Sequence, residues 1–253
     1  MLNNNLVVYT TIFGDYDELL DPKEKFDGCD FICFTDQTTI KSDIWDIKFV
    51  KDYDLPPNLM NRKYKILPHL FLSNYDKSLY IDANILILNN PLELANQYLS
   101  ISDFALPKHF ARNCIYEEAK ECVITGKSKF IETNKQIEFY RYNGFPKKYG
   151  LGENNILFRN HKCENIINTM NEWWHELLTH TTRDQLSLFY IFWKNSIENV
   201  YLFEYSINMN KFFIKKNHKN LNNNIFKKFS ISIIIRFKRI IINFLSKYSL
   251  IKL

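Results

Sequence analysis

The stretch "KSLYIDANILILNN", residues 77–90, is an apolar run interrupted by two polar side chains, Asp82 and Asn84. A strand that is covered on both faces is almost continuously apolar, so residues 78–88 predict a central strand of a sheet. An ionised carboxylate inside such a strand would be costly to bury without a partner. We therefore expect Asp82 at the strand's end, either facing a cation or hydrogen-bond donors, or capping a turn.

Similar apolar runs recur along the chain, separated by segments with helical spacing of apolar residues. Strands are predicted over residues 6–10, 30–35, 46–50, 103–106, 155–158 and 199–203, and helices over residues 61–72, 164–178 and 183–195. This alternation predicts an α/β sandwich around a mainly parallel central sheet. In such sheets ligands bind at the carboxyl ends of the strands, where we place Asp82.

Charge divides the chain into two parts. Residues 1–204 contain 22 Lys and Arg against 28 Asp and Glu, whereas the residues after Glu204 contain eleven Lys and Arg and no acidic residue. Blocks of like charge are typical of interaction segments. We predict one globular domain over residues 1–220 and a basic, amphipathic helical segment over residues 221–253.

The C-terminal segment is apolar, but its longest uncharged run, residues 229–235, is too short to span a bilayer. In a helix its polar residues would form one stripe opposite a broad apolar face. This pattern predicts a helix on an anionic membrane surface, with a helix packed on the domain or on a partner as the alternative. No groove-reading motif accompanies the basic residues, so nucleic acid is not an expected partner. The stripe is formed by Lys228, Ser232, Arg236, Arg239, Asn243 and Ser246.

Five cysteines without a Cys-x-x-Cys pair predict reduced core thiols rather than disulfides or a zinc site. The N-terminal residues lack the basic region of a signal peptide. We expect a cytoplasmic protein, held by its C-terminal segment at the inner face of the cell membrane.

Asp82 and Asn84 are two oxygen-bearing side chains two positions apart, which is a variant of the Asp-x-Asp metal site. Oxygen ligands suit Mg²⁺ or Mn²⁺, and these ions commonly complete their coordination with substrate phosphates. A nucleotide diphosphate is therefore the expected ligand.

Seven segments between about Val7 and Trp193 resemble the TOD/MUCI-like glycosyltransferase family of plants and bacteria. They are "VVYTTIFGDYDEL", "DFICFTD", "RKYKILPHLFL", "YIDANI", "ENNILFRNHKC", "NEWWHEL" and "RDQLSL". The resemblance implies a GT-A-like, metal-dependent enzyme. It would transfer a sugar from a nucleotide-diphosphate donor to a glycan or lipid-linked acceptor in capsule or lipopolysaccharide synthesis. Asn84 departs from the acidic pattern of such metal sites, which leaves open whether metal is required.

The resemblance also implies donor-binding residues. The first strand and its loop would hold the nucleoside, Arg62 would contact the diphosphate, and Asp36 would either approach the base or cap a turn. Lys65, with Lys63 as a solvated neighbour, would add positive charge at the start of a helix. The donor set is Thr10, Thr11, Phe13, Gly14, Asp36, Arg62, Lys65, Asp82 and Gln185.

For catalysis the resemblance implies Asp184 as the base of an inverting transfer, with a helix N-cap as the alternative role. In a retaining transfer Asp184 and Gln185 would instead line the reacting face of the donor. Glu153 is an alternative base. The expected acceptor residues are Asn154, Arg159 and His161, which equally fit a polar loop and an edge strand.

Two further assignments follow from the resemblance. His218 is a candidate third metal ligand, although a lone histidine among lysines is commonly just solvated. Trp173 and Trp174 would stack on sugar rings or pack in the core. Two rival functions remain open at this point: a metal-dependent hydrolase of a lipid amide or ester, and a non-catalytic sugar-nucleotide binder.

Overall fold

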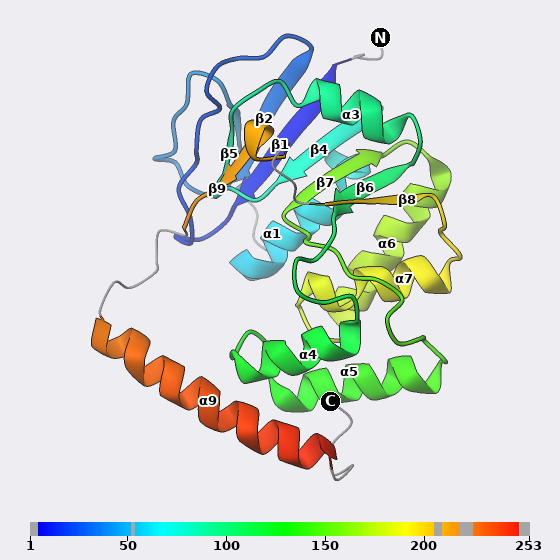
Figure 1. The fold of residues 1–253 in the computed structure, drawn as a ribbon. Helices are drawn as coiled ribbons and strands as arrows, with labels where there is room; N and C mark the ends of the chain where they lie inside the picture. The colour runs from blue at the N-terminus through cyan, green and yellow to red at the C-terminus, as the bar shows by residue number, and fades with distance from the viewer. Residues whose placement is uncertain (1–4, 52–53, 205–208, 218–224, 248–253) are drawn as a thin grey trace.

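A computed structural model describes residues 5–51, 54–204, 209–217 and 225–247. Its centre is a seven-stranded sheet with the order β3-β2-β1-β4-β7-β6-β8 (Figure 1). β7 is antiparallel to both of its neighbours, and the other neighbouring strands pair in parallel. The strands are β1 (Leu6–Ile12), β2 (Cys29–Thr35), β3 (Asp46–Phe49), β4 (Lys77–Ile81), β6 (Phe104–Pro107), β7 (Ile156–Asn160) and β8 (Val200–Phe203).

Both faces of the sheet are covered. Val7 and Tyr9 of β1 point to a core shared with α1, α4, α5, α6 and α7, whereas Leu6 and Val8 point to a second core shared with α3 and a small sheet of β5 and β9. The expected α/β sandwich with a mainly parallel sheet is confirmed. The remaining elements are α1 (Pro57–Ile66), α2 (Pro68–Phe71), β5 (Ile85–Ile87), α3 (Leu92–Leu99), α4 (Ile115–Ile124), α5 (Phe130–Tyr142), α6 (Glu164–Thr179), a 3₁₀ turn (Asp184–Leu186), α7 (Leu188–Lys194), α8 (Met209–Phe212), β9 (Phe213–Lys215) and α9 (Ile225–Lys247).

The apolar run over residues 77–90 forms two strands, not one. β4 ends at Ile81, and a turn follows in which the Ile85 N–H donates to the Asp82 carbonyl at 2.9 Å. β5 then leaves the large sheet and pairs with β9. Asp82 thus lies at the tip of a central strand, as expected, because the turn interrupts the apolar run there.

The helix expected over residues 61–72 is also divided. Pro68 has no N–H to donate and disfavours helical backbone at Leu67, which lies at φ −111° and ψ 52°, so α1 ends at Ile66 and α2 begins afresh. α1 starts at Pro57, four residues before the predicted start. Arg62 and Lys65 therefore lie in the second half of the helix, and their expected place at its start is wrong.

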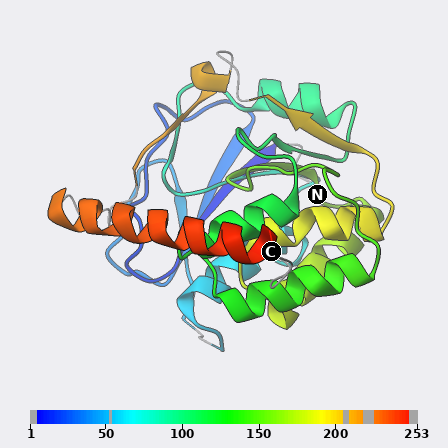
Figure 2. The same cartoon turned by 60° about the horizontal axis from the view of Figure 1, so that its bottom comes forward.

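The C-terminal segment contains a helix, α9, that lies beside α4 in two views of the molecule (Figures 1 and 2). The predicted domain boundary near residue 220 falls outside the described residues. Among the described residues, no helix is long and apolar enough to cross a membrane. All five cysteines are free thiols, and burial raises the pKa of Cys29, Cys33 and Cys122 to about 12.

Candidate active site

Two adjoining pockets open where β1 and β4 end. The β1 pocket, of about 580 Å³, is lined by the end of β1, the following loop and the start of α1. The central pocket, of about 730 Å³, extends from there to the residues that follow β6, the residues that precede β7 and the first half of α4. Because they share part of their walls, they form one continuous cleft. The shared residues are Tyr16, Arg62, Asp82, Lys127 and Arg183.

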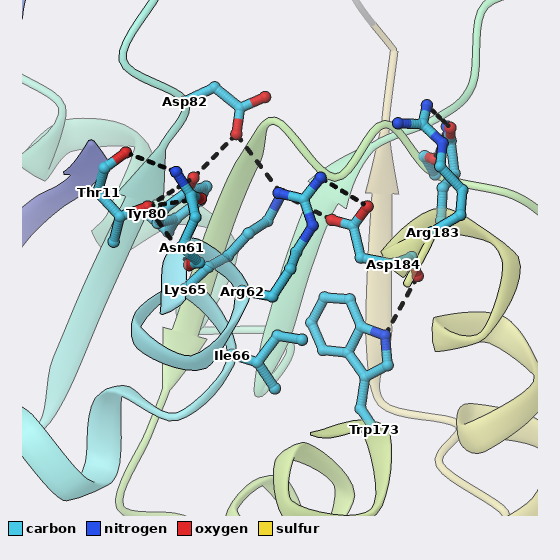
Figure 3. A network of polar contacts seen from close by, with 12 residues as sticks. Thr11, Asn61, Arg62, Lys65, Ile66, Tyr80, Asp82, Trp173, Arg183 and Asp184 are labelled. Carbon is cyan, nitrogen blue, oxygen red and sulfur yellow. Dashed lines mark hydrogen bonds and ion pairs between the residues drawn. The ribbon is translucent and has the colours of Figure 1, made fainter. Parts of the chain in front are cut away.

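A network of ion pairs lies at the junction of the two pockets (Figure 3). The Lys65 ammonium is only 2% exposed and lies 2.8 Å from Asp184 Oδ2 and 3.5 Å from Asp82 Oδ1. Arg62 Nη2 lies 3.6 Å from Asp184 Oδ1, and the Tyr80 hydroxyl donates to Asp82 Oδ1 at 2.9 Å. Two carboxylates that are 102 positions apart in the sequence therefore share one buried cation.

Asp184 is ionised and strongly held. Burial alone would raise its pKa, but the charges of Arg62, Lys65 and Arg183 hold the pKa of this carboxyl well below its ordinary range. Its backbone carbonyl accepts a hydrogen bond from the Trp173 indole at 3.2 Å, and Asp184 is the first residue of the 3₁₀ turn, whose N-cap is Arg183. Such a carboxylate is a very weak proton acceptor, so the geometry favours Asp184 as the residue that orders Arg62 and Lys65.

The central pocket is more basic than the rest of the fold. Its walls contain seven Lys or Arg side chains and four Asp or Glu side chains, whereas residues 1–204 as a whole carry an excess of acidic residues. Walls of one sign in a cleft concentrate ions of the other sign. An anionic ligand is therefore favoured here.

The β1 pocket contains three of the predicted nucleoside-binding residues: Thr11, Phe13 and Gly14. Gly14 has φ +68°, and its N–H donates to both oxygens of Asp36, at 3.0 and 3.1 Å. Asp36 thus fixes the loop from behind and lines neither pocket. Thr10 is fully buried and also lines neither pocket.

The loop before β7 brings Glu153 and Asn154 to the central pocket. The Gln185 side chain, which lines the same pocket, donates to the Gly152 carbonyl at 2.9 Å. The Asp82 N–H donates to the Asn155 carbonyl, also at 2.9 Å. Residues predicted separately from three segments therefore meet in one wall.

Arg159 and His161 do not belong to this wall. Arg159 is fully buried beneath α1, where its guanidinium bonds to the Tyr9 hydroxyl and donates to the Lys65 carbonyl at 3.0 Å. His161 is 1% exposed, and its Nε2 lies 3.1 Å from the Leu72 carbonyl. Burial and the Arg159 charge lower the pKa of His161 to about 4. Both are core residues, because β7 is covered on both faces, and their expected acceptor role is wrong.

Asn84 is turned away from the cleft. It is 3% exposed and lines neither pocket. Its side-chain amide donates to the Lys216 carbonyl at 2.8 Å, and its backbone carbonyl accepts the Lys216 N–H at 2.8 Å. This pairing ties the segment after β9 to the Asp82 turn. His218, the candidate third ligand, lies outside the described residues.

The residues that the structure describes do not by themselves fit a divalent-ion centre. Of the predicted ligands, Asp82 alone reaches the cleft, and among the described residues there is no group of three His, Cys, Asp or Glu side chains that could hold an ion. The same point of the cleft is lined by Arg62, Lys65 and Arg183, whose donors suit a phosphate group directly.

Trp173 is fully buried and Trp174 is packed against the same core, and neither lines the cleft. The core alternative therefore holds for both. Trp173 still affects the site, since its indole supports the backbone of Asp184.

One polar cluster at the far end of the central pocket was not predicted. His109 Nδ1 accepts the N–H groups of Ala111 and Arg112, so its Nε2 carries the hydrogen and lies 3.5 Å from both Glu118 and Glu153. Arg112 Nε donates to Glu118 at 2.6 Å. The sequence shows no motif here, because the groups belong to α4 and to two loops, one after β6 and one before β7, and they meet only in the fold.

Glu118→Gln tests how strongly this cluster is held. Burial raises the pKa of Glu118, but the His109 hydrogen bond and the Arg112 charge lower it to about 2, against an ordinary 4.5. Because the folded pKa is the lower one, the stabilisation is complete above pH 4.5 and is lost as the pH falls towards 2. We expect the variant to lose roughly 3 kcal/mol of unfolding free energy at neutral pH.

Urea unfolding near neutral pH and near pH 3 checks this prediction, because the difference from wild type should shrink in acid. Glu117→Gln, an exposed neighbour on the same helix, is the matched control and should change little. An equal loss at both pH values would contradict the assigned pKa.

The chain is similar to proteins described as glycosyltransferases. A relative described as "Probable hexosyltransferase MUCI70" from Arabidopsis thaliana is 24% identical over 211 residues, which cover 72% of this chain and 36% of that protein. The chain thus spans about a third of that relative's length. Among solved structures, "WbbM bifunctional glycosytransferase apo structure" is 14% identical with a TM-score of 0.42, covering 79% of this chain and 38% of the other.

The sequence profile "TOD1/MUCI70, glycosyltransferase-like domain" matches residues 1–223, which include all elements of the large sheet and both pockets. This match confirms the resemblance drawn from the motifs. The chain therefore belongs to the TOD1/MUCI70 glycosyltransferase-like domain family.

Proposed function

We propose that the protein is a glycosyltransferase that takes a sugar from a nucleotide-diphosphate donor. The observation that carries the proposal is the junction of the two pockets, where Arg62, Lys127 and Arg183 face the space that joins them. A nucleoside in the β1 pocket and a sugar in the central pocket would put the diphosphate at this junction. Cationic donors there stabilise the charge that develops on the leaving diphosphate.

The family and its hexosyltransferase relative support transfer rather than another use of the same cleft. The acceptor would enter the central pocket beside Glu153, which is 19% exposed and reaches His109 Nε2. For an inverting transfer we assign Glu153 as the base that takes the acceptor proton. Asp184 positions Arg62 and Lys65. A glycan or lipid-linked acceptor of bacterial surface polysaccharide stays the proposed biological substrate.

Ligand-induced thermal stabilisation tests donor binding. Saturating nucleoside diphosphates should raise the melting temperature, because a ligand at 100 times its Kd stabilises the folded state by about 2.7 kcal/mol. For a chain of this size that corresponds to a shift of several degrees. The matching nucleoside without phosphates is the control and should shift much less.

Each nucleotide is measured with Mn²⁺ and with EDTA, which tests the expected cation separately. A shift that survives EDTA would show that the cationic side chains suffice for binding, whereas a shift only with Mn²⁺ would support the Asp82 ion site. No shift with any nucleoside diphosphate under either condition would overturn the proposal. Release of free sugar from the donor, without transfer to any glycan, would favour a hydrolase.

A further inference from the structure

α9 is fixed to the body along one narrow face. Arg239 makes two 2.8 Å contacts with Glu121 of α4. Ile242 is 7% exposed, and Ile235 packs against the main core. These three α9 residues are four and three positions apart, so they lie on one side of the helix. The predicted polar stripe is thus partly used against the domain, as the alternative of a helix packed on the domain expects.

The opposite face of α9 is apolar and open to solvent. Five of the large apolar side chains there are between 38% and 66% exposed. An amphipathic helix of a folded domain normally turns its apolar face to the core, and a contiguous apolar face on the surface marks an interaction site. The five are Ile233, Ile234, Phe237, Ile240 and Ile241.

Positive charge borders this outer face on both sides. Arg236 lies three residues after Ile233 and four before Ile240, so it borders one edge. Lys238 lies four residues after Ile234 and three before Ile241, so it borders the other edge. Both cations are exposed, and no acidic residue occurs anywhere from 205 to 253.

We propose that the outer face of α9, formed by these five apolar residues with Arg236 and Lys238, binds the surface of an anionic lipid membrane. An apolar strip with a cation at each edge is the form of a helix that lies in the headgroup layer. Charge complementarity decides the occupant. A second copy would set the same cations against each other, whereas anionic headgroups pair with both edges.

The ion pair between α9 and α4 connects this surface to the cleft through α4. Glu121, which holds Arg239, is less than one turn along α4 from Glu118, and Glu118 lines the central pocket. The same short helix therefore contacts the membrane-binding helix and the acceptor end of the cleft. An acceptor carried by a lipid would be brought near that end.

Vesicle pelleting of the full chain tests the proposal. We expect binding to phosphatidylcholine vesicles that contain about 30% phosphatidylglycerol, and at least tenfold weaker binding to pure phosphatidylcholine. Phe237→Ser with Ile240→Ser should weaken binding to anionic vesicles at least tenfold. Arg236→Ser with Lys238→Ser should weaken it roughly 30-fold, the effect of two interfacial cations, and should leave binding to neutral vesicles unchanged.

Ile131→Ser with Tyr142→Ser is the matched control, because both side chains are exposed apolar groups on α5. This pair should leave vesicle binding unchanged. Nucleoside diphosphate stabilisation should persist in all three double variants, which separates this proposal from the proposed function. The proposal is overturned by no pelleting, by equal pelleting with neutral and anionic vesicles, or by a dimer in light scattering that Phe237→Ser with Ile240→Ser dissociates.

Discussion

Arg62→Met is expected to slow sugar transfer by about 10²–10³-fold and to weaken nucleoside diphosphate binding about tenfold. The Arg62 guanidinium lines both pockets, is 25% exposed at the junction and is oriented by Asp184 at 3.6 Å. In the proposed transfer, negative charge accumulates on the leaving diphosphate. The stabilisation of this charge by the Arg62 guanidinium is therefore greatest in the transition state. The larger effect should therefore fall on turnover.

Lys63→Met on the same helix is the matched control, since Lys63 lines neither pocket. Arg62→Lys should recover part of the binding but less of the rate, because an ammonium keeps the charge and loses the forked geometry. Steady-state kinetics and calorimetric titration measure the two effects separately. Unchanged transfer rates in Arg62→Met would contradict the placement of the diphosphate at the junction of the pockets.

Glu153→Gln is expected to lower turnover by about 10²–10⁴-fold while nucleoside diphosphate affinity stays within about twofold of wild type. Glu153 lines the central pocket and not the β1 pocket, so the amide leaves the nucleoside and phosphate contacts intact. Its carboxylate is also more accessible than that of Asp184, which is 3% exposed and bound by two cations. Glu132→Gln, on the exposed side of α5, is the control.

The anomeric configuration of the product, read by NMR, completes this test. If the configuration is inverted and Glu153→Gln leaves turnover unchanged, Asp184 would be the base instead of Glu153. Retention would show that neither carboxylate acts as an acceptor base, and Gln185 and Asp184 would then line the reacting face of the donor. Asp184→Asn should in addition destabilise the fold, because it leaves the buried Lys65 with Asp82 alone.

The sequence predicts the strands and the cleft edge well, because buried strands are apolar and ligand-binding side chains follow them. Asp82 is predicted from the apolar pattern, whereas the family resemblance implies Arg62, Lys65, Glu153 and Asp184, and all five line the cleft. Asp82 directly follows an apolar strand pattern, and Asp184 directly precedes an apolar helix pattern. Such a charged residue is costly to bury unless the fold provides a partner.

The failures have a different physical cause. Arg159 lies within the buried strand β7 and Glu153 lies in the loop before it, and the local sequence does not show that an arginine at this position is buried. Asn84 was assigned by its spacing from Asp82, but the turn points its amide at Lys216. The His109 cluster depends on contacts between a loop and α4, and such contacts between distant segments leave no periodic trace in the sequence.

Arg159 helps to fix the position of Lys65 before a ligand binds in the cleft. Its guanidinium and the Tyr9 hydroxyl both donate to the Lys65 carbonyl, so the last turn of α1 is tied to the sheet from below. The ammonium of Lys65 is held from above by two carboxylates. This charge is therefore preorganised, and no reorganisation energy is spent on it when a donor arrives. Any conformational change on ligand binding would therefore have to come from the loops that line the cleft rather than from α1 and the sheet.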